Sequence, residues 1–107
     1  MTTLTNVEDM AREHPDTFYI YSWYERSNLK PGELCKLIFR TDGDKSGERM
    51  WVKVEEVRKI ETKTDTKIEY VGILDNIPIV VDMKLGDQVE FGPEHIADIG
   101  PVVKKAR

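Results

Sequence analysis

Apolar side chains recur at every second position in three separate segments of this 107-residue chain. In the first segment, 33–40, the alternating residues are Cys35, Leu37 and Phe39. A period of two is typical of a half-buried strand, whereas an amphipathic helix repeats its apolar positions every three or four residues. The alternation therefore predicts that the core of this protein is built from β-sheet.

The segments 48–58 and 67–74 show the same period. The apolar face of the first consists of Met50, Val52 and Val54. Val57 is out of phase with them, which predicts a β-bulge near Glu55–Glu56. The second segment becomes apolar on both faces at its end, so we expect it in the middle of the sheet. The polar residues 61–66 between the two segments predict a hairpin.

Gly and Pro residues mark the remaining turns. The strongest turn signal is Asp42–Gly43, inside a polar stretch at 41–47. Pro78 cannot donate to a sheet ladder, so the strand that we expect at 79–82 lies at an edge or begins there. After it, the sequence predicts a turn at 83–87, a short strand at 88–91 and a helical turn at 93–97.

One short pattern occurs twice along the chain. The segments 30–37 (KPGELCKL) and 84–91 (KLGDQVEF) both contain Lys, then Pro or Leu, then Gly and an acid, followed by alternating apolar residues. The Gly allows the backbone to turn, and the acid can accept hydrogen bonds from nearby backbone N–H groups. We call each of these turns, together with the start of the strand that follows it, a corner of the sheet. Two corners of the same pattern predict a curved antiparallel sheet that is closed or nearly closed. The alternative is chance recurrence of a common turn signal.

A short helix is expected at the N-terminus. Thr5 is the predicted N-cap, and Glu8 follows it at the spacing of a capping box. Pro15 disfavours helical geometry at His14, so the helix should end there. Its apolar side chains are few, which indicates that it packs on the surface of the sheet.

The aromatic run FYIYSWY predicts a strand over 17–22. Alternation on that strand would place Tyr19, Tyr21 and Trp23 on one face. In the segment 48–58, Trp51 lies on the face opposite to the apolar side chains, so we expect it to point outward. Exposed Tyr and Trp favour interfaces, because each combines an apolar ring with a polar atom. We therefore take these four residues as a candidate binding surface. The alternative is that both faces of the strand are covered, one of them by the N-terminal helix.

Together these patterns predict one α+β domain spanning residues 1–107. Its centre is a small, strongly bent antiparallel β-sheet or partly open β-barrel within 17–99. The N-terminal helix, within 1–16, packs on this sheet, and a short helical turn lies near the C-terminus. Residues 100–107 form a flexible tail that contains Lys104, Lys105 and Arg107.

The formal net charge is −4 at pH 7, which argues against a nucleic-acid partner. Acids concentrate at 82–98, where Lys84 is the one basic residue. These acids form a second candidate binding surface, consisting of Asp82, Asp87, Glu90, Glu94 and Asp98. The single cysteine excludes an internal disulfide and favours a reducing compartment. With no secretory signal and no membrane-spanning run in the sequence, we expect a cytoplasmic protein without membrane contact.

No residue set predicts catalysis or metal binding. His14 and His95 are far apart in the sequence, and no Cys or His pair has ligand spacing. Cys35 occupies an inward strand position, where cysteine behaves as a small hydrophobic residue. We therefore predict a protein that is not an enzyme and has no cofactor, no metal and no catalytic residue.

The C-terminal half of the chain resembles the uncharacterised YegJ-like domain family of bacteria. The matching segments are 50–54 (MWVKV), 70–78 (YVGILDNIP) and 85–98 (LGDQVEFGPEHIAD). The resemblance covers about half of the chain, and Ile99 stands where the family pattern has an aromatic residue. Members of the family are small or fused modules without an assigned activity. The resemblance implies a small cytosolic bacterial domain and supplies no catalytic residue.

Two functional hypotheses follow. The first is a non-enzymatic protein-interaction module of the inhibitor or immunity type, whose acidic surface covers a basic surface of another protein. A homodimer through the aromatic surface is a variant of this hypothesis. The alternative is a small barrel that binds single-stranded nucleic acid. In that case Tyr19, Tyr21 and Trp23 would stack on bases, with Arg26, Lys30 and Lys36 nearby.

Overall fold

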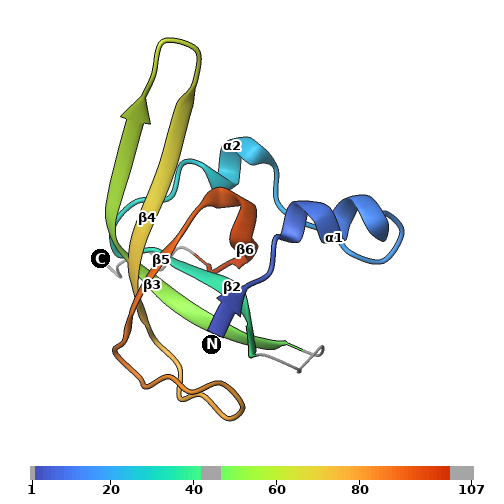
Figure 1. Cartoon of the computed structure of the whole chain (residues 1–107), viewed down its shortest axis with the longest axis vertical. Coiled ribbons are helices and arrows are strands. Elements are labelled where there is room, and N and C mark those ends of the chain that lie inside the picture. The colour runs from blue at the N-terminus through green and yellow to red at the C-terminus, as the bar shows by residue number, and fades with distance from the viewer. Residues whose placement is uncertain (1, 42–46, 102–107) are drawn as a thin grey trace, which may run out of the picture.

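The computed structural model describes residues 2–41 and 47–101 and shows a strongly curled antiparallel sheet that forms a half-barrel (Figure 1). The elements in chain order are β1 (Thr2–Leu4), α1 (Val7–Glu13), α2 (Trp23–Arg26), β2 (Leu34–Thr41), β3 (Glu48–Glu61), β4 (Thr66–Leu74), β5 (Gln88–Phe91), the 3-10 turn η1 (Pro93–His95) and β6 (Ile96–Ile99). The predicted fold class is confirmed: an α+β protein with a bent antiparallel sheet, an N-terminal helix and a short helical turn near the C-terminus.

The strands β1 to β5 lie side by side in sequence order, and each is antiparallel to its neighbours. β6 pairs with the same edge of β2 as β1 does. β1 lies beside Phe39–Thr41, and β6 lies beside Cys35–Leu37. The chain therefore leaves β5 at one edge of the sheet, turns through η1 and returns to β2, which curls the sheet on itself.

The β3–β4 hairpin has the bulge that the sequence predicts. The pairing register shifts between Val54 and Glu56, as expected from the phase break before Val57. Beyond this bulge the side chains of β3 are exposed, and the hairpin extends past the rest of the sheet (Figure 1). β4 lies between β3 and β5, so its predicted internal position is confirmed.

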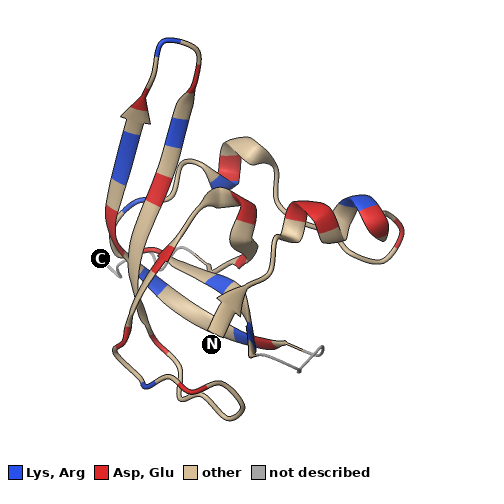
Figure 2. Cartoon of the chain, viewed as in Figure 1, with Lys and Arg blue, Asp and Glu red and all other residues tan. Residues whose placement is uncertain are grey.

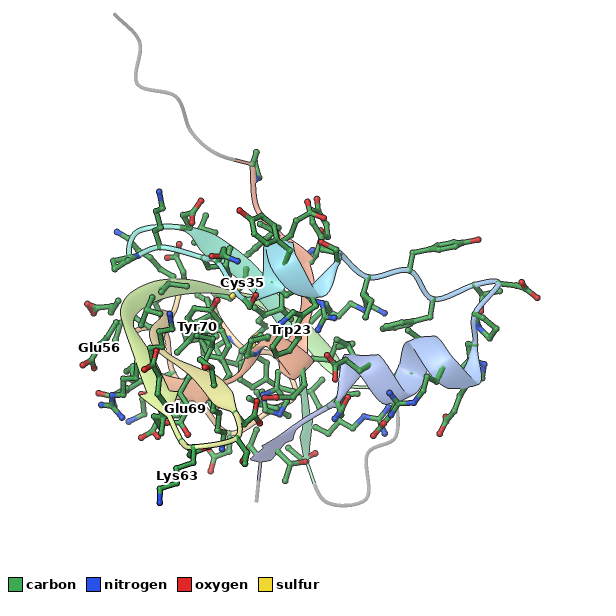
Figure 3. All side chains as sticks on the ribbon, turned by 90° about the horizontal axis from the view of Figure 1, so that it is seen from above. Trp23, Cys35, Glu56, Lys63, Glu69 and Tyr70 are labelled. Carbon is green, nitrogen blue, oxygen red and sulfur yellow. The ribbon has the colours of Figure 1, made fainter. Side chains whose placement is uncertain are left out.

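The main core fills the inside of the curl, as the alternating pattern predicts. Its buried side chains are Leu29, Cys35, Leu37, Phe39, Met50, Val52, Val54, Tyr70, Leu74, Val81, Val89, Phe91 and Ile96. Tyr70 and Cys35 lie among the strands in Figure 3, whereas Lys63 at the hairpin tip points away from them. A smaller cluster of Val7, Ile38 and Ala97 joins α1 to the opposite face of β2.

The first of the two repeated corners precedes β2. Gly32 has φ +94°, a left-handed conformation that glycine adopts without steric cost. The Lys30 N–H donates to Glu33 Oε1 at 2.6 Å, which closes the turn. The Gly32 N–H donates to the Val54 carbonyl at 2.7 Å, and the Val54 N–H donates to the Glu33 carbonyl at 2.9 Å. These two bonds attach the corner to β3.

The second corner precedes β5 and repeats this arrangement. Gly86 has φ +93°, and the Lys84 N–H donates to Asp87 Oδ2 at 2.9 Å. The Gly86 N–H donates to the Leu74 carbonyl, and the Leu74 N–H donates to the Asp87 carbonyl, both at 2.8 Å. The same sequence pattern thus forms the same backbone hydrogen bonds against two neighbouring strands, and both corners lead into strands of the curled sheet.

The predicted start of the N-terminal helix is wrong by one residue. Asn6 is the N-cap, and its Oδ1 accepts the Asp9 N–H at 3.1 Å. The Thr5 N–H donates to the Ile38 carbonyl at 3.0 Å, so Thr5 still belongs to the edge of the sheet. The residues before it form β1, an element that the sequence did not predict.

The predicted strand over 17–22 is also wrong. The N–H groups of Thr17 and Phe18 both donate to the His14 carbonyl, which makes a turn after α1. Ser22 then begins α2: its Oγ accepts the Glu25 N–H at 3.2 Å and donates to Glu25 Oε1 at 2.9 Å. A capping box therefore determines the local structure where aromatic residues indicated a strand.

The predicted strand over 79–82 is absent from the described residues. The N–H groups of Ile79, Val80 and Val81 donate to the Glu48 carboxylate at 2.7, 2.8 and 3.0 Å, so they have no strand partner. Ile79 is 90% exposed. The predicted helical turn at 93–97 ends at His95, because the chain continues as β6. The predicted turn at Asp42–Gly43 and residues 102–107 of the basic tail lie outside the described residues.

Candidate functional site

Two of the four predicted aromatic residues line one groove of about 650 Å³. Tyr21 comes from the segment before α2, and Trp51 comes from β3. We call this site the aromatic–acidic groove; its lining residues are Tyr21, Glu25, Asn28, Leu29, Glu33, Trp51, Asp98, Ile99, Gly100 and Pro101. Asp98, from the predicted acidic surface, lies in it too. The groove thus combines members of both candidate surfaces.

The position of Trp51 is determined by three neighbours. Its backbone N–H donates to Asn76 Oδ1 at 2.7 Å. The Lys36 ammonium, from the adjacent position on β2, lies 4.5 Å from the centre of the indole ring. A side chain on Gly100 would come within 3.3 Å of the ring, so glycine leaves the indole room at this point. The half-buried indole therefore already has a cation of the protein itself over its ring.

Three carboxylates line the aromatic–acidic groove, and each accepts a local hydrogen bond. Glu25 Oε1 accepts from Ser22 Oγ at 2.9 Å. Glu33 Oε1 accepts the Lys30 N–H, and Asp98 Oδ1 accepts the Ile99 N–H at 2.9 Å. These contacts with residues one to three positions away orient the acids locally. Within residues 2–41 and 47–101, the residues that line the groove include three carboxylates and no Lys, Arg or His, although the Lys36 ammonium lies over the Trp51 ring.

The other two predicted aromatic residues lie outside this groove. Tyr19 is 78% exposed, and its hydroxyl donates to the Asp16 carbonyl at 2.8 Å. Trp23 is the first residue of α2, and its ring lies 5.7 Å from the guanidinium carbon of Arg26. Because the segment is a turn and a helix instead of a strand, the expected row of aromatic rings on one strand face does not form.

The predicted acidic surface is divided among several places. Asp82 and Glu90 line a hollow of about 300 Å³, Glu90 and Glu94 line another of about 190 Å³, and Asp98 lines the aromatic–acidic groove. Asp87 accepts a backbone hydrogen bond in the second corner. Figure 2 shows acidic positions distributed over helices, strands and turns. Acids that are close in the sequence therefore contribute to different sites.

The nucleic-acid hypothesis counts Arg26 among the basic residues near the stacking rings, but its side chain is not available at the surface. The side chain is buried, and Nε donates to the Tyr21 carbonyl at 2.7 Å. Nη1 donates to Glu8 Oε2 at 2.8 Å and to the Pro93 carbonyl at 2.9 Å. Arg26 therefore joins α1, α2 and η1, and its charge is used inside the protein.

Tyr70 is a second internal polar residue that was not singled out from the sequence. The side chain is fully buried, and its hydroxyl donates to the Arg26 carbonyl at 2.8 Å and accepts the Leu29 N–H at 3.2 Å. Its ring lies 5.2 Å from that of Phe91. Tyr70 thus orders the chain after α2, which forms one wall of the aromatic–acidic groove.

Cys35 and His95 are the two side chains whose surroundings change their reactivity most clearly in the described residues. Cys35 is buried, and burial raises the pKa of its thiol to about 12, so it stays protonated at neutral pH. His95 Nδ1 accepts the Gly92 N–H at 3.0 Å, and burial lowers the pKa of this imidazole. Within residues 2–41 and 47–101, no three His, Cys, Asp or Glu side chains come together as metal ligands.

None of the helices in the described part of the chain has the length and apolar character needed to cross a bilayer. Comparison with family models, with curated proteins and with solved structures finds no match for this sequence or fold. The resemblance to the YegJ-like family therefore stays a prediction.

Proposed function

We propose that this protein is a protein-interaction module that binds a basic segment of a partner protein in the aromatic–acidic groove. The observation that supports the proposal is the placement of Tyr21 and Trp51 beside three carboxylates, with no cationic side chain lining the groove in the described residues. Aromatic faces attract cations, and carboxylates accept paired hydrogen bonds from a guanidinium group. An arginine side chain of the partner matches both features, with the exposed Tyr21 ring as the stacking face because Lys36 lies over Trp51.

The geometry favours arginine over lysine as the anchoring residue. Glu25, Glu33 and Asp98 each use one oxygen for a local bond, and their second oxygens have no hydrogen bond within the described residues. A planar guanidinium can stack on an aromatic ring and still donate from its edge, whereas a lysine ammonium acts as a point charge. The groove volume of about 650 Å³ accommodates more than one side chain, as a segment of a folded partner requires.

The nucleic-acid hypothesis receives less support. Arg26 is buried, and the three carboxylates beside Tyr21 would repel phosphate groups. Its favourable features are the exposed aromatic rings and the Lys30 and Lys36 side chains, neither of which is buried. We therefore treat binding of single-stranded DNA as an outcome that the test of the proposal has to detect.

The test is a titration of the full chain with acetyl-Gly-Arg-Gly-Arg-Gly-Arg-amide, followed by nuclear magnetic resonance shifts of the Trp51 indole and the Asp98 amide. Asp98→Asn keeps the oxygen that accepts from Ile99 and removes one charge. We expect this variant to weaken binding about fivefold, equal to about 1 kcal/mol. Glu61→Gln removes the same charge from the exposed β3–β4 hairpin, outside the groove, and should leave the affinity unchanged.

Two controls decide the outcome. A peptide with citrulline in place of arginine keeps the shape without the charge and should bind at least about tenfold more weakly. A decamer of thymidylate should not shift the Trp51 resonance at low salt. The proposal is overturned if both peptides bind equally, if shifts lie outside the groove, or if the oligonucleotide binds there instead.

A further inference from the structure

The two ends of the sheet, β1 and β5, line the same hollow of about 300 Å³. β1 contributes Thr2 and Leu4, and β5 contributes Gln88 and Glu90. Among the described residues, β1 pairs with β2 alone and β5 pairs with β4 alone. Two sheet edges without a strand partner therefore face one opening in the half-barrel.

The backbone of β1 presents free hydrogen-bonding groups to this opening. The Thr5 N–H donates to the Ile38 carbonyl, which identifies this pair as a hydrogen-bonded one. Residues of an antiparallel pair alternate between bonding to the partner and pointing away from it. The N–H and C=O groups of Thr2 and Leu4 therefore point away from β2.

The same argument applies to β5. The Leu74 N–H donates to the Asp87 carbonyl, and the ladder between β4 and β5 continues from this pair through Phe91. Alternation then directs the backbone groups of Gln88 and Glu90 away from β4. Each edge thus offers two residues with donors and acceptors that no described strand uses.

The direction of the strands determines what can fill the opening. β1 to β5 alternate in direction, so β1 and β5 run in the same sense. One added strand, running the opposite way, would be antiparallel to both edges and would complete the alternation around the barrel. An exposed edge of this kind accepts an extended peptide by β-strand addition.

The side chains around the opening specify the peptide. Leu4, Phe39, Met83 and Val89 give the hollow apolar side chains from four segments of the fold. Asp82 and Glu90 line it as well, and both are exposed acids. Successive side chains of a strand point to opposite faces, so one face of the added strand must be apolar and the other can be basic.

We propose that an extended segment of a partner protein, with apolar residues at alternate positions and Lys or Arg between them, adds as a strand between β1 and β5. This opening shares no lining residue with the aromatic–acidic groove. The proposal is therefore independent of the function proposed above, and the two can fail separately.

The experiment uses the full chain and the peptide acetyl-Lys-Val-Lys-Val-Lys-Val-Lys-amide. Strand addition should slow amide hydrogen exchange of Leu4, Gln88 and Glu90 at least about tenfold at saturation, because their N–H groups become bonded. A peptide of the same composition without alternation, with three Val followed by four Lys, should give no such protection. A third peptide, N-methylated at its valines, lacks the donors for one edge and should also give none.

A pair of variants tests the charges. Asp82→Asn with Glu90→Gln should weaken binding of the alternating peptide about threefold to tenfold. Glu56→Gln with Glu61→Gln removes two charges from the β3–β4 hairpin and should have no effect. All four positions have exposed side chains, so the variants should fold.

Three results would overturn the proposal. One is equal protection by the alternating and the non-alternating peptide. Another is a set of peptide-induced changes restricted to the aromatic–acidic groove. The third is protection of Leu4 and Glu90 in the free protein together with a concentration-dependent dimer mass by light scattering, which would assign the opening to a second copy of this chain.

Discussion

Arg26 is the one charged side chain that is buried among the described residues, and three segments of the chain depend on it. Its guanidinium donates to Glu8 and to the carbonyls of Tyr21 and Pro93. Removing the guanidinium leaves these acceptors without their donor in a region that water enters poorly. The loss should therefore exceed that of an ordinary surface ion pair.

We predict that Arg26→Met lowers the free energy of unfolding by about 3 kcal/mol, as loss of one partner of a buried ion pair does. Urea denaturation measures it. Arg12→Met is the matched control, because Arg12 is exposed and pairs with Asp9 on the same helix. The control should cost less than about 0.5 kcal/mol. Equal losses in the two variants would contradict the assigned role of Arg26.

The role of Arg26 could not be predicted from the sequence for a physical reason. Its partners Glu8 and Pro93 are distant along the chain, so no local pattern connects them. Ser22 and Glu25 are different, because a capping box is a local signal at fixed spacing. That signal could have been recognised, but the aromatic residues around it indicated a strand.

At the level of elements, the two corners show how far a short pattern determines backbone structure. Both glycines have φ near +90°, and no atom outside the two adjoining residues lies within 4 Å of a Cβ added at either position. The cost of a substitution there comes from the left-handed backbone alone. The two corners should therefore respond alike.

We predict that Gly32→Ala and Gly86→Ala each lower the free energy of unfolding by about 1–2 kcal/mol. The two losses should agree within about 0.5 kcal/mol and should add in the double variant. Thermal and urea unfolding measure both. Asparagine enters the left-handed region more readily than alanine, so Gly32→Asn should cost less than Gly32→Ala. Strongly unequal losses would show that the corners are not equivalent.

The strands that the sequence predicted correctly are those in which alternation and burial agree. β2, β3 and β4 each direct their alternating apolar side chains to the inside of the curled sheet. The bulge in β3 occurs where this alternation is interrupted. The prediction failed at 79–82, because a distant carboxylate, Glu48, binds the backbone N–H groups. It also missed β6, whose four residues give too short a pattern beside a proline turn.

For the molecule as a whole, stability should depend on pH through two groups with lowered pKa. Burial lowers the pKa of His95, although Glu94 and Glu8 act in the opposite direction. Burial alone would raise the pKa of Glu48, but the three N–H donors from Ile79, Val80 and Val81 outweigh it and lower the pKa. In both cases the unfolded chain binds the proton more tightly, so acid favours unfolding.

We predict two windows in which the free energy of unfolding falls with pH. The contribution of His95 is complete above its ordinary pKa near 6.5 and is lost as the pH falls below it. The contribution of Glu48 is present above its ordinary pKa near 4.5 and is lost as the pH falls through its lower folded value. Urea midpoints between pH 8 and pH 3 measure both.

Two variants separate the windows. His95→Asn keeps an acceptor for the Gly92 N–H and should flatten the fall in stability that begins below the ordinary histidine pKa near 6.5. Glu48→Gln should flatten it below about pH 4.5 and leave the upper window unchanged. An unaltered curve in His95→Asn would show that another group titrates in the upper window.

The site is a property of the whole molecule, and this explains which part of it could be predicted. The alternation along β3 correctly predicted that the Trp51 side chain does not enter the core. The concentration of acids at 82–98 identified Asp98 as part of an acidic surface. Their meeting with Tyr21 depends on the return of β6 to β2, which no local pattern encodes. Residue types were therefore predictable, and their assembly into a groove was not.

The two corners also make the chain a natural substitution experiment. At matched positions one corner has Pro31 and Glu33, while the other has Leu85 and Asp87, yet the hydrogen bonds are the same. The four-residue unit of Lys, a variable residue, Gly and an acid is thus a transferable part, which a designer could graft before any strand that must enter a curved sheet beside an existing one.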